Sequence, residues 1–176
     1  MKQVLPALAL ALVASAASAQ RHNANAPVDV NADSIELQDR ANRAVLAGNV
    51  QVKQADMTLN ASRVTVAYTG QVTDGSPQIS RLDASGGVTV RRPAQTARSQ
   101  FAVYDLNRRV ITMLGAVSLT QAGNTVNGGR LTINLDTDRA VIDGSSVGGT
   151  VKGADGTVTQ SSGGRVSGRF SVPNRN

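Results

Sequence analysis

The sequence predicts an all-β protein built from stacked antiparallel strands, and three features of the chain lead to that prediction. Apolar and polar residues alternate over many short segments, which is typical of a sheet with one buried face. A turn signal recurs along the chain, and Gly86, Gly115 and Gly144 follow one another at intervals of 29 residues. No polar run has the 3.6-residue apolar stripe of a helix, so no helix is expected.

The recurring turn signal consists of Asn or Asp followed by Arg, then β-branched or Leu residues, then Gly. It occurs at 42–48, at 107–115 and at 138–144, and it is clearest within the stretch from Phe101 to Gly144. A repeat of this length indicates a stacked architecture, in which one unit cannot bury its apolar face alone.

The first 19 residues have the pattern of a signal peptide. Lys2 supplies a positive start, residues 4–14 are rich in Ala and Leu, and the Ala-Ser-Ala sequence at 17–19 is a cleavage site before Gln20. We therefore expect export to a periplasm, although an uncleaved anchor remains the alternative. Residues 20–26 are small and polar, and we expect them to form a flexible lead.

Nine short strands are expected in the body of the chain, which spans residues 27–144. The first begins at Pro27, where no ladder donor is needed. Two longer breaks are expected at 69–78, which contains Asp-Gly and Ser-Pro, and at 91–97, which contains Pro93. The expected strands are 27–32, 34–38, 48–54, 57–61, 64–68, 79–83, 86–90, 117–119 and 131–135.

The carboxyl-terminal part has a different amino-acid composition. Residues 145–164 are rich in Gly and Ser and are expected to form a loop. Residues 165–173 regain β character and predict a last strand that Pro173 ends, within a terminal segment of residues 165–176.

Composition excludes several functional classes. The chain of 176 residues has no Cys, so it has no disulfide, thiol nucleophile or zinc-thiolate site. The single histidine, His22, is not expected to be catalytic or to bind a metal. The formal net charge of +6 fits an anionic ligand or simply a solvated surface. Nucleic acid is disfavoured by the export signal and by the scarcity of aromatic residues for stacking.

No catalytic motif stands out. The Gly-rich run at 123–130 lacks the Lys and hydroxyl residue of a nucleotide-binding loop. Asn134, Asp136 and Asp138 have the spacing of a calcium loop, but Arg139 and Ser145 stand where Gly and Glu are needed. These acids are better explained by turn formation, and neither enzymatic activity nor a cofactor or metal is expected.

The alternating strands leave two interpretations of the interior open. Val, Ala and Leu are abundant and aromatic residues are few. The interior is either an ordinary core filled by its own side chains, or an apolar trough between diverging sheets that accepts aliphatic chains.

Three stretches resemble the LptA/OstA-like family of periplasmic lipopolysaccharide transport bridge proteins. The first is 27–33, the second is 46–54 followed by 59–64, and the third runs from 104–106 through 114–121 to 126–132. The resemblance implies a slightly twisted antiparallel β-jelly roll of stacked strands, with a V-shaped apolar groove.

The resemblance also implies a function without catalysis. Members of this family shield lipid A acyl chains in the groove and bridge the inner and outer membranes for lipopolysaccharide transport and outer-membrane assembly. They form head-to-tail homo-oligomers and meet LptC-like inner-membrane and LptD-like outer-membrane components. Two alternatives remain: an LptC-like component of the same pathway, and a structural self-assembling β-solenoid with no lipid cargo.

Twelve residues are predicted to line the groove. The resemblance implies five of them, and the alternation of the strands adds the other seven. The five are Val28, Val30, Val90, Tyr104 and Leu106, and the seven are Val50, Val52, Leu59, Val117, Leu119, Leu131 and Ile133.

Overall fold

The computed structural model describes residues 22–70, 77–144, 151–152, 158–159 and 165–169. Within them the all-β prediction is confirmed, because the only helical element is one 3-10 turn, η1 (Asp39–Ala41). The strands are β1 (Val28–Asn31), β2 (Ser34–Gln38), β3 (Arg43–Gln54), β4 (Met57–Thr69), β5 (Gln78–Arg92), β6 (Gln95–Asp105), β7 (Val110–Gln121), β8 (Asn124–Asn134), β9 (Arg139–Asp143), β10 (Val151–Lys152), β11 (Val158–Thr159) and β12 (Ser167–Arg169).

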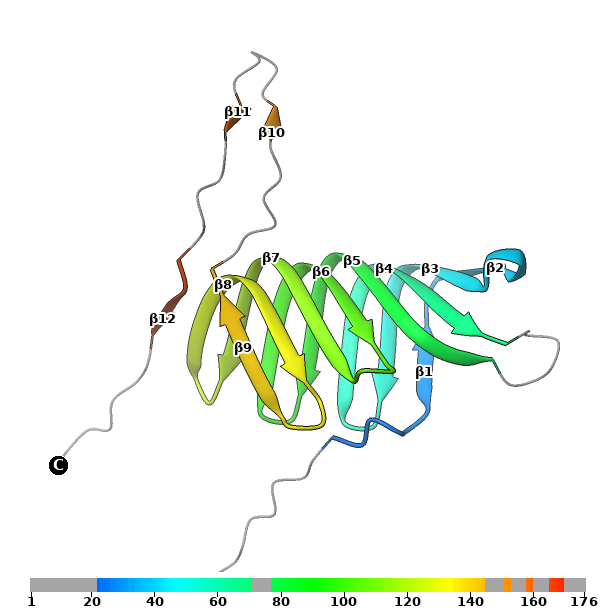
Figure 1. The fold of residues 1–176 in the computed structure, drawn as a ribbon, viewed down its shortest axis with the longest axis horizontal. Helices are drawn as coiled ribbons and strands as arrows, with labels where there is room; N and C mark the ends of the chain where they lie inside the picture. The colour runs from blue at the N-terminus through cyan, green and yellow to red at the C-terminus, as the bar shows by residue number, and fades with distance from the viewer. Residues whose placement is uncertain (1–21, 71–76, 145–150, 153–157, 160–164, 170–176) are drawn as a thin grey trace, which may run out of the picture.

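All strands except β10 and β11, which pair with each other, belong to one ten-stranded antiparallel sheet. The order is β1-β3-β4-β5-β6-β7-β8-β12, and in addition β2 pairs with β3 and β9 pairs with β8. Figure 1 shows the strands winding into an elongated roll, with β1 and β2 near one end and β8, β9 and β12 near the other.

Several strands are longer than predicted, because they continue through the positions where the pairing register shifts. The predicted strands 57–61 and 64–68 form the single strand β4, and 79–83 and 86–90 form β5. The pairing register shifts beside Gly48 in β3, Gly86 in β5 and Gly115 in β7, and each of these glycines has a φ of +77° to +83°. The glycine spacing therefore marks bulges on alternate strands. Gly144 differs from them, because it follows the end of β9.

The predicted turn signal also has a structural basis. Asn42, Arg109 and Asp138 have φ values of 48° to 54° and stand immediately before β3, β7 and β9. Asn and Asp tolerate this left-handed conformation better than most residues. The break predicted at 91–97 is shorter than expected, because Arg92 pairs with Gln95 and only two residues form the turn.

The bulges divide each long strand into two halves, and the halves form two layers. We call them the β2/β9 layer and the β1/β12 layer, after the short strands that pair with each. The β2/β9 layer contains residues 43–47, 63–69, 78–85, 101–105, 110–114 and 130–134. The β1/β12 layer contains residues 50–54, 57–61, 88–92, 95–98, 117–121 and 124–128.

The two ends of the sheet are built alike. At one end, β1 and β2 pair with the two halves of β3. At the other end, β12 and β9 pair with the two halves of β8. The strand predicted at 165–173 is present as β12, while residues 170–173 of that prediction lie outside the described residues. The signal peptide and most of the predicted loop at 145–164 also lie outside them.

Candidate functional site

All twelve predicted groove residues lie in or against one apolar cluster that runs through both layers. Eight of them are among its fully buried members. Val28, Val30, Leu106 and Leu119 are partly buried and pack against it. The eight buried residues are Val50, Val52, Leu59, Val90, Tyr104, Val117, Leu131 and Ile133.

One polar residue, Gln54, points inward among these apolar side chains. Val50, Val52 and Gln54 alternate along β3, and the Gln54 residue is only 2% exposed. Its side-chain oxygen accepts a hydrogen bond of 2.6 Å from the Tyr104 hydroxyl, which comes from the opposite layer. The bond therefore joins the two layers across the interior.

The layers approach each other along a line that we call the seam. Here the turns at 55–56 and 93–94, which end the β1/β12 layer, come close to the turns at 106–109 and 135–138, which end the β2/β9 layer. Arg92 at the end of β5 forms an ion pair with Asp138 in the turn before β9. The Arg92 side chain is 8% exposed, so this ion pair is largely withdrawn from solvent on the arginine side.

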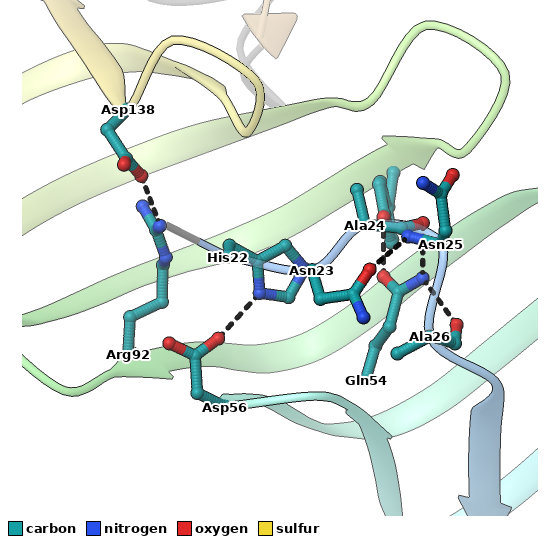
Figure 2. A network of polar contacts seen from close by, with 10 residues as sticks. His22, Asn23, Ala24, Asn25, Ala26, Gln54, Asp56, Arg92 and Asp138 are labelled. Carbon is teal, nitrogen blue, oxygen red and sulfur yellow. Dashed lines mark hydrogen bonds and ion pairs between the residues drawn. The ribbon is translucent and has the colours of Figure 1, made fainter. Parts of the chain in front are cut away.

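Residues 22–26 lie along the seam, and we call them the amino-terminal strap (Figure 2). His22 Nδ1 is 2.6 Å from an Asp56 carboxylate oxygen. The Gln54 side-chain amide donates to the backbone oxygens of Ala24 at 2.9 Å and Ala26 at 3.0 Å. Part of the predicted flexible lead is thus held by specific contacts in this structure.

The strap also contacts the opposite layer. Arg109 Nη2 donates to the Asn25 side-chain oxygen at 2.8 Å, and Arg109 Nη1 is 3.0 Å from an Asp136 carboxylate oxygen. Because Gln54 and Asp56 belong to one side of the seam and Arg109 to the other, the strap spans the opening between the layers.

An open cavity of about 550 Å³ adjoins the strap. Val28, Ile79 and Leu106 supply its apolar wall, and all three pack against the buried cluster. Gln54 also lines the cavity, so a molecule entering here meets both apolar surface and a buried amide. The complete lining is Ala24, Asn25, Ala26, Val28, Gln54, Pro77, Gln78, Ile79, Leu106 and Asn107.

Burial controls the ionisation of both tyrosines. Burial raises the pKa of Tyr104 to about 12, so its hydroxyl stays protonated and donates to Gln54 well into the alkaline range. Burial also raises the pKa of Tyr68, and the Asp39 carboxylate, which accepts its hydroxyl at 3.0 Å, adds to that shift.

Asn134, Asp136 and Asp138, which have calcium-loop spacing, form a turn and ion pairs, and the turn was predicted. The Asn134 side-chain oxygen accepts the backbone N–H groups of Asp136 and Thr137, which closes the turn after β8. Asp136 and Asp138 form ion pairs with arginines of the seam. The described residues contain no group of three or more acidic or histidine side chains placed to hold a metal.

Sequence reasoning did not identify Gln54, His22 or Asp56 as site residues. A signal for Gln54 was present, because it continues the period-two alternation of Val50 and Val52 and so had to point inward. His22 carried no such signal, since its partner is 34 positions away in a turn.

The part of the chain described by the structure has no helix long and apolar enough to cross a membrane.

Comparisons with known proteins agree with this architecture. Residues 29–139 match a family model described as the LptA/LptD amino-terminal domain lipopolysaccharide transport protein. An uncharacterized protein of Rhizobium meliloti (strain 1021) is 32% identical over 149 residues, covering 77% of this chain and 80% of its own.

A solved structure shares the fold. It is LptH of Pseudomonas aeruginosa, described as the LptA-homologous periplasmic component of a conserved lipopolysaccharide transport device. The superposition has a TM-score of 0.66 and covers 86% of this chain and 99% of LptH, at 18% sequence identity. The predicted LptA-like fold is confirmed by this similarity.

Proposed function

Because the chain belongs to the LptA/LptD amino-terminal domain family of lipopolysaccharide transport proteins, we propose that it is a periplasmic carrier of lipopolysaccharide. In this proposal the acyl chains of lipid A enter the interior between the two layers, while the polar head stays outside. The predicted signal peptide and the periplasmic LptH fold support that location.

The observation that supports this proposal most directly is the single apolar cluster that contains eight of the twelve predicted groove residues and against which the other four pack. An acyl chain exposed to water costs about 0.8 kcal/mol for each CH₂ group. An interior that is apolar from β3 to β8 removes that cost along the whole roll. Such shielding needs no catalytic group, which fits the absence of a nucleotide-binding motif from the sequence.

We further propose that copies join end to end to form a bridge between the membranes. Within the described residues, β1 and β2 pair only with β3, and β9 and β12 only with β8, so both ends of the sheet offer strand edges. Ile35 and Leu37 on β2 and Val141 on β9 are exposed apolar residues at these ends. Strand addition would extend the sheet and cover them. LptC-like and LptD-like components would bind the terminal edges in the same way.

Site-specific photo-crosslinking tests the carrier function. A photoreactive residue at Val30 or Leu106, which pack against the interior, is expected to label lipopolysaccharide in cells. The same residue at Arg43, which is exposed on β3, is the matched control and is expected to remain unlabelled. Equal labelling at all three positions would contradict an interior site.

Native mass spectrometry tests the bridge and the carrier together. Lipopolysaccharide-sized adducts on monomers and on a concentration-dependent oligomer series support both roles. An oligomer series without adducts would instead indicate a structural polymer.

A further inference from the structure

We propose that Gln54 binds the carbonyl group that links a fatty-acyl chain to its head, and that the amino-terminal strap occupies this site in the unloaded protein. The inference rests on the proposed carrier function and adds to it a specific residue, a ligand group and a competing segment of the chain itself.

The hydrogen bonds of Gln54 define which chemical groups can bind at the site. Its Nε2 has two hydrogens, and each is used by a backbone carbonyl oxygen, of Ala24 at 2.9 Å and of Ala26 at 3.0 Å. Its oxygen is used by the Tyr104 hydroxyl at 2.6 Å. This last bond fixes the orientation of the amide, so both N–H groups point toward the strap and select acceptors.

An acyl linkage supplies the same kind of acceptor as the strap. The carbonyl oxygen of an ester or amide accepts hydrogen bonds as a peptide oxygen does, and the hydrocarbon beyond it is fully apolar. Gln54 is the end of the inward-facing set Val50, Val52 and Gln54, so a carbonyl bound there places its chain beside the apolar cluster. No other element of the head is required for this contact.

The burial of the amide favours an exchange of partners over the simple loss of the strap. A buried donor without an acceptor costs about 1–3 kcal/mol. If the strap leaves the seam, Gln54 loses both acceptors at once, and a ligand carbonyl restores at least one of them. A saturated chain without a carbonyl leaves the amide unpaired, so the site distinguishes acyl from alkyl chains.

The strap is placed so that it can leave without breaking the sheet. Its residues precede β1, which begins at Val28, and none of them belongs to a ladder. Its side-chain contacts are with residues at the seam, namely Asp56 and Arg109. The cavity of about 550 Å³ lies against the strap, Val28 and Leu106, which gives a chain direct access to Gln54.

A pair of probes that differ only in the carbonyl tests the ligand group. The protein beginning at the predicted mature residue Gln20 is titrated with a fluorescent dodecanoyl ester and with the matching dodecyl ether. We expect the ester to bind about five- to tenfold more tightly, because its carbonyl oxygen accepts from Gln54, whereas the ether offers only a weaker acceptor oxygen. Equal affinities for the two probes would overturn the carbonyl site while leaving the carrier function intact.

Two variants test the residue. Gln54→Met removes both N–H donors at similar size and is expected to abolish the preference for the ester. The matched control is Gln51→Met on the same strand, whose side chain bonds Asn60 outside the cluster and whose loss should leave the preference unchanged. An ester preference that survives in Gln54→Met would contradict the assignment.

Wild-type protein provides a readout that does not depend on the folding of a variant. The NMR signals of the Gln54 side-chain amide are expected to shift when the ester binds and to shift differently with the ether. Identical spectra for the two complexes would exclude contact between this amide and the carbonyl.

The strap is tested separately through its anchor. His22→Ala removes the contact with Asp56 and is expected to raise the affinity for both probes several-fold, because the competing segment is less firmly held. Unchanged or weaker binding would show that the strap does not compete. Failure of both probes to bind wild-type protein would instead contradict the proposed function itself.

Discussion

Tyr104 and Gln54 are joined by a hydrogen bond although they are 50 positions apart and although β4 and β5 lie between their strands in the sheet. The bond does not follow the ladder but crosses the interior from one layer to the other. Both residues are at most 2% exposed, so the contact is shielded from water. It fixes the spacing of the layers at the seam and orients the amide that faces the strap.

Removal of this bond is expected to destabilise the roll. Tyr104→Phe leaves the Gln54 oxygen buried without its donor, and we expect a loss of about 1–3 kcal/mol in the free energy of unfolding. Urea denaturation followed by circular dichroism measures it. Tyr68→Phe is the control, because its hydroxyl bonds Asp39 at the edge of the roll, and a smaller loss is expected there. An equal loss in the two variants would argue against a special role for the interior bond.

Alkaline pH is expected to destabilise the protein through its tyrosines. The pKa of Tyr104 is raised from 10.0 to about 12, so between these values the unfolded state has already released a proton that the folded state retains. The contribution of Tyr104 to stability is therefore fully present below pH 10 and is lost as pH rises toward about 12. The raised pKa of Tyr68 acts in the same direction.

The absorbance of phenolate measures the ionisation of the tyrosines directly, since the chain has only two tyrosines and no tryptophan. In Tyr68→Phe the remaining absorbance change reports Tyr104 alone. Titration of that tyrosine near pH 10 in the folded protein would contradict its burial in the interior.

The bulge glycines give a matched pair of substitutions. Gly86 and Gly87 have φ values of +83° and +77°, so Ala is strained at either position. A Cβ at Gly86 would also lie 2.6 Å from the Ser62 Cβ, whereas at Gly87 nothing lies within 4 Å. We expect Gly87→Ala to cost about 1 kcal/mol and Gly86→Ala clearly more. Thermal unfolding compares the two, and a larger loss in Gly87→Ala would contradict this account of the bulge.

The ion pair at the seam is expected to matter more than one on the open surface. Asp138→Asn keeps a residue that tolerates the left-handed backbone but removes the carboxylate charge beside the largely buried Arg92 guanidinium, and we expect a loss of about 1–3 kcal/mol. Asp83→Asn, which removes the charge from the exposed pair with Arg81, should cost less than about 1 kcal/mol. Chemical denaturation measures the loss of unfolding free energy in each variant. Similar losses in the two variants would contradict a stabilising role of Arg92 at the seam.

The strands and turns were largely predictable from local signals. The strand at 34–38 was predicted with its observed bounds. The Asn42-Arg43 and Asp138-Arg139 signals lie at the observed starts of β3 and β9, but the strand predicted there began only at residue 48, and no separate strand was predicted at 139–143. These features depend on the alternation of apolar and polar residues and on residues that adopt left-handed turns, and both are determined by a few neighbouring residues. The continuation of β5 through Gly86 was not predicted, because a glycine pair reads locally as a turn and only pairing with β4 and β6 makes it a bulge.

Of the candidate site, only the inward direction of its apolar residues was predictable, and their role as a groove stays a prediction. The twelve groove residues follow from alternation and family resemblance, and their burial in one cluster agrees with that pattern. The contacts of His22 with Asp56 and of Tyr104 with Gln54 join residues 34 and 50 positions apart, and no local pattern encodes such distances. They arise only when the bulges bring the two layers together.

The repeating pair of neighbouring strands also sets the length of the roll. Neighbouring strands are about 4.8 Å apart, so each two-strand unit adds about 10 Å to the roll. Because both ends are made by short strands on β3 and β8, an inserted or deleted unit between them would leave the ends unchanged. The span of the protein is therefore adjustable in steps of one repeat, independently of whatever its two ends bind.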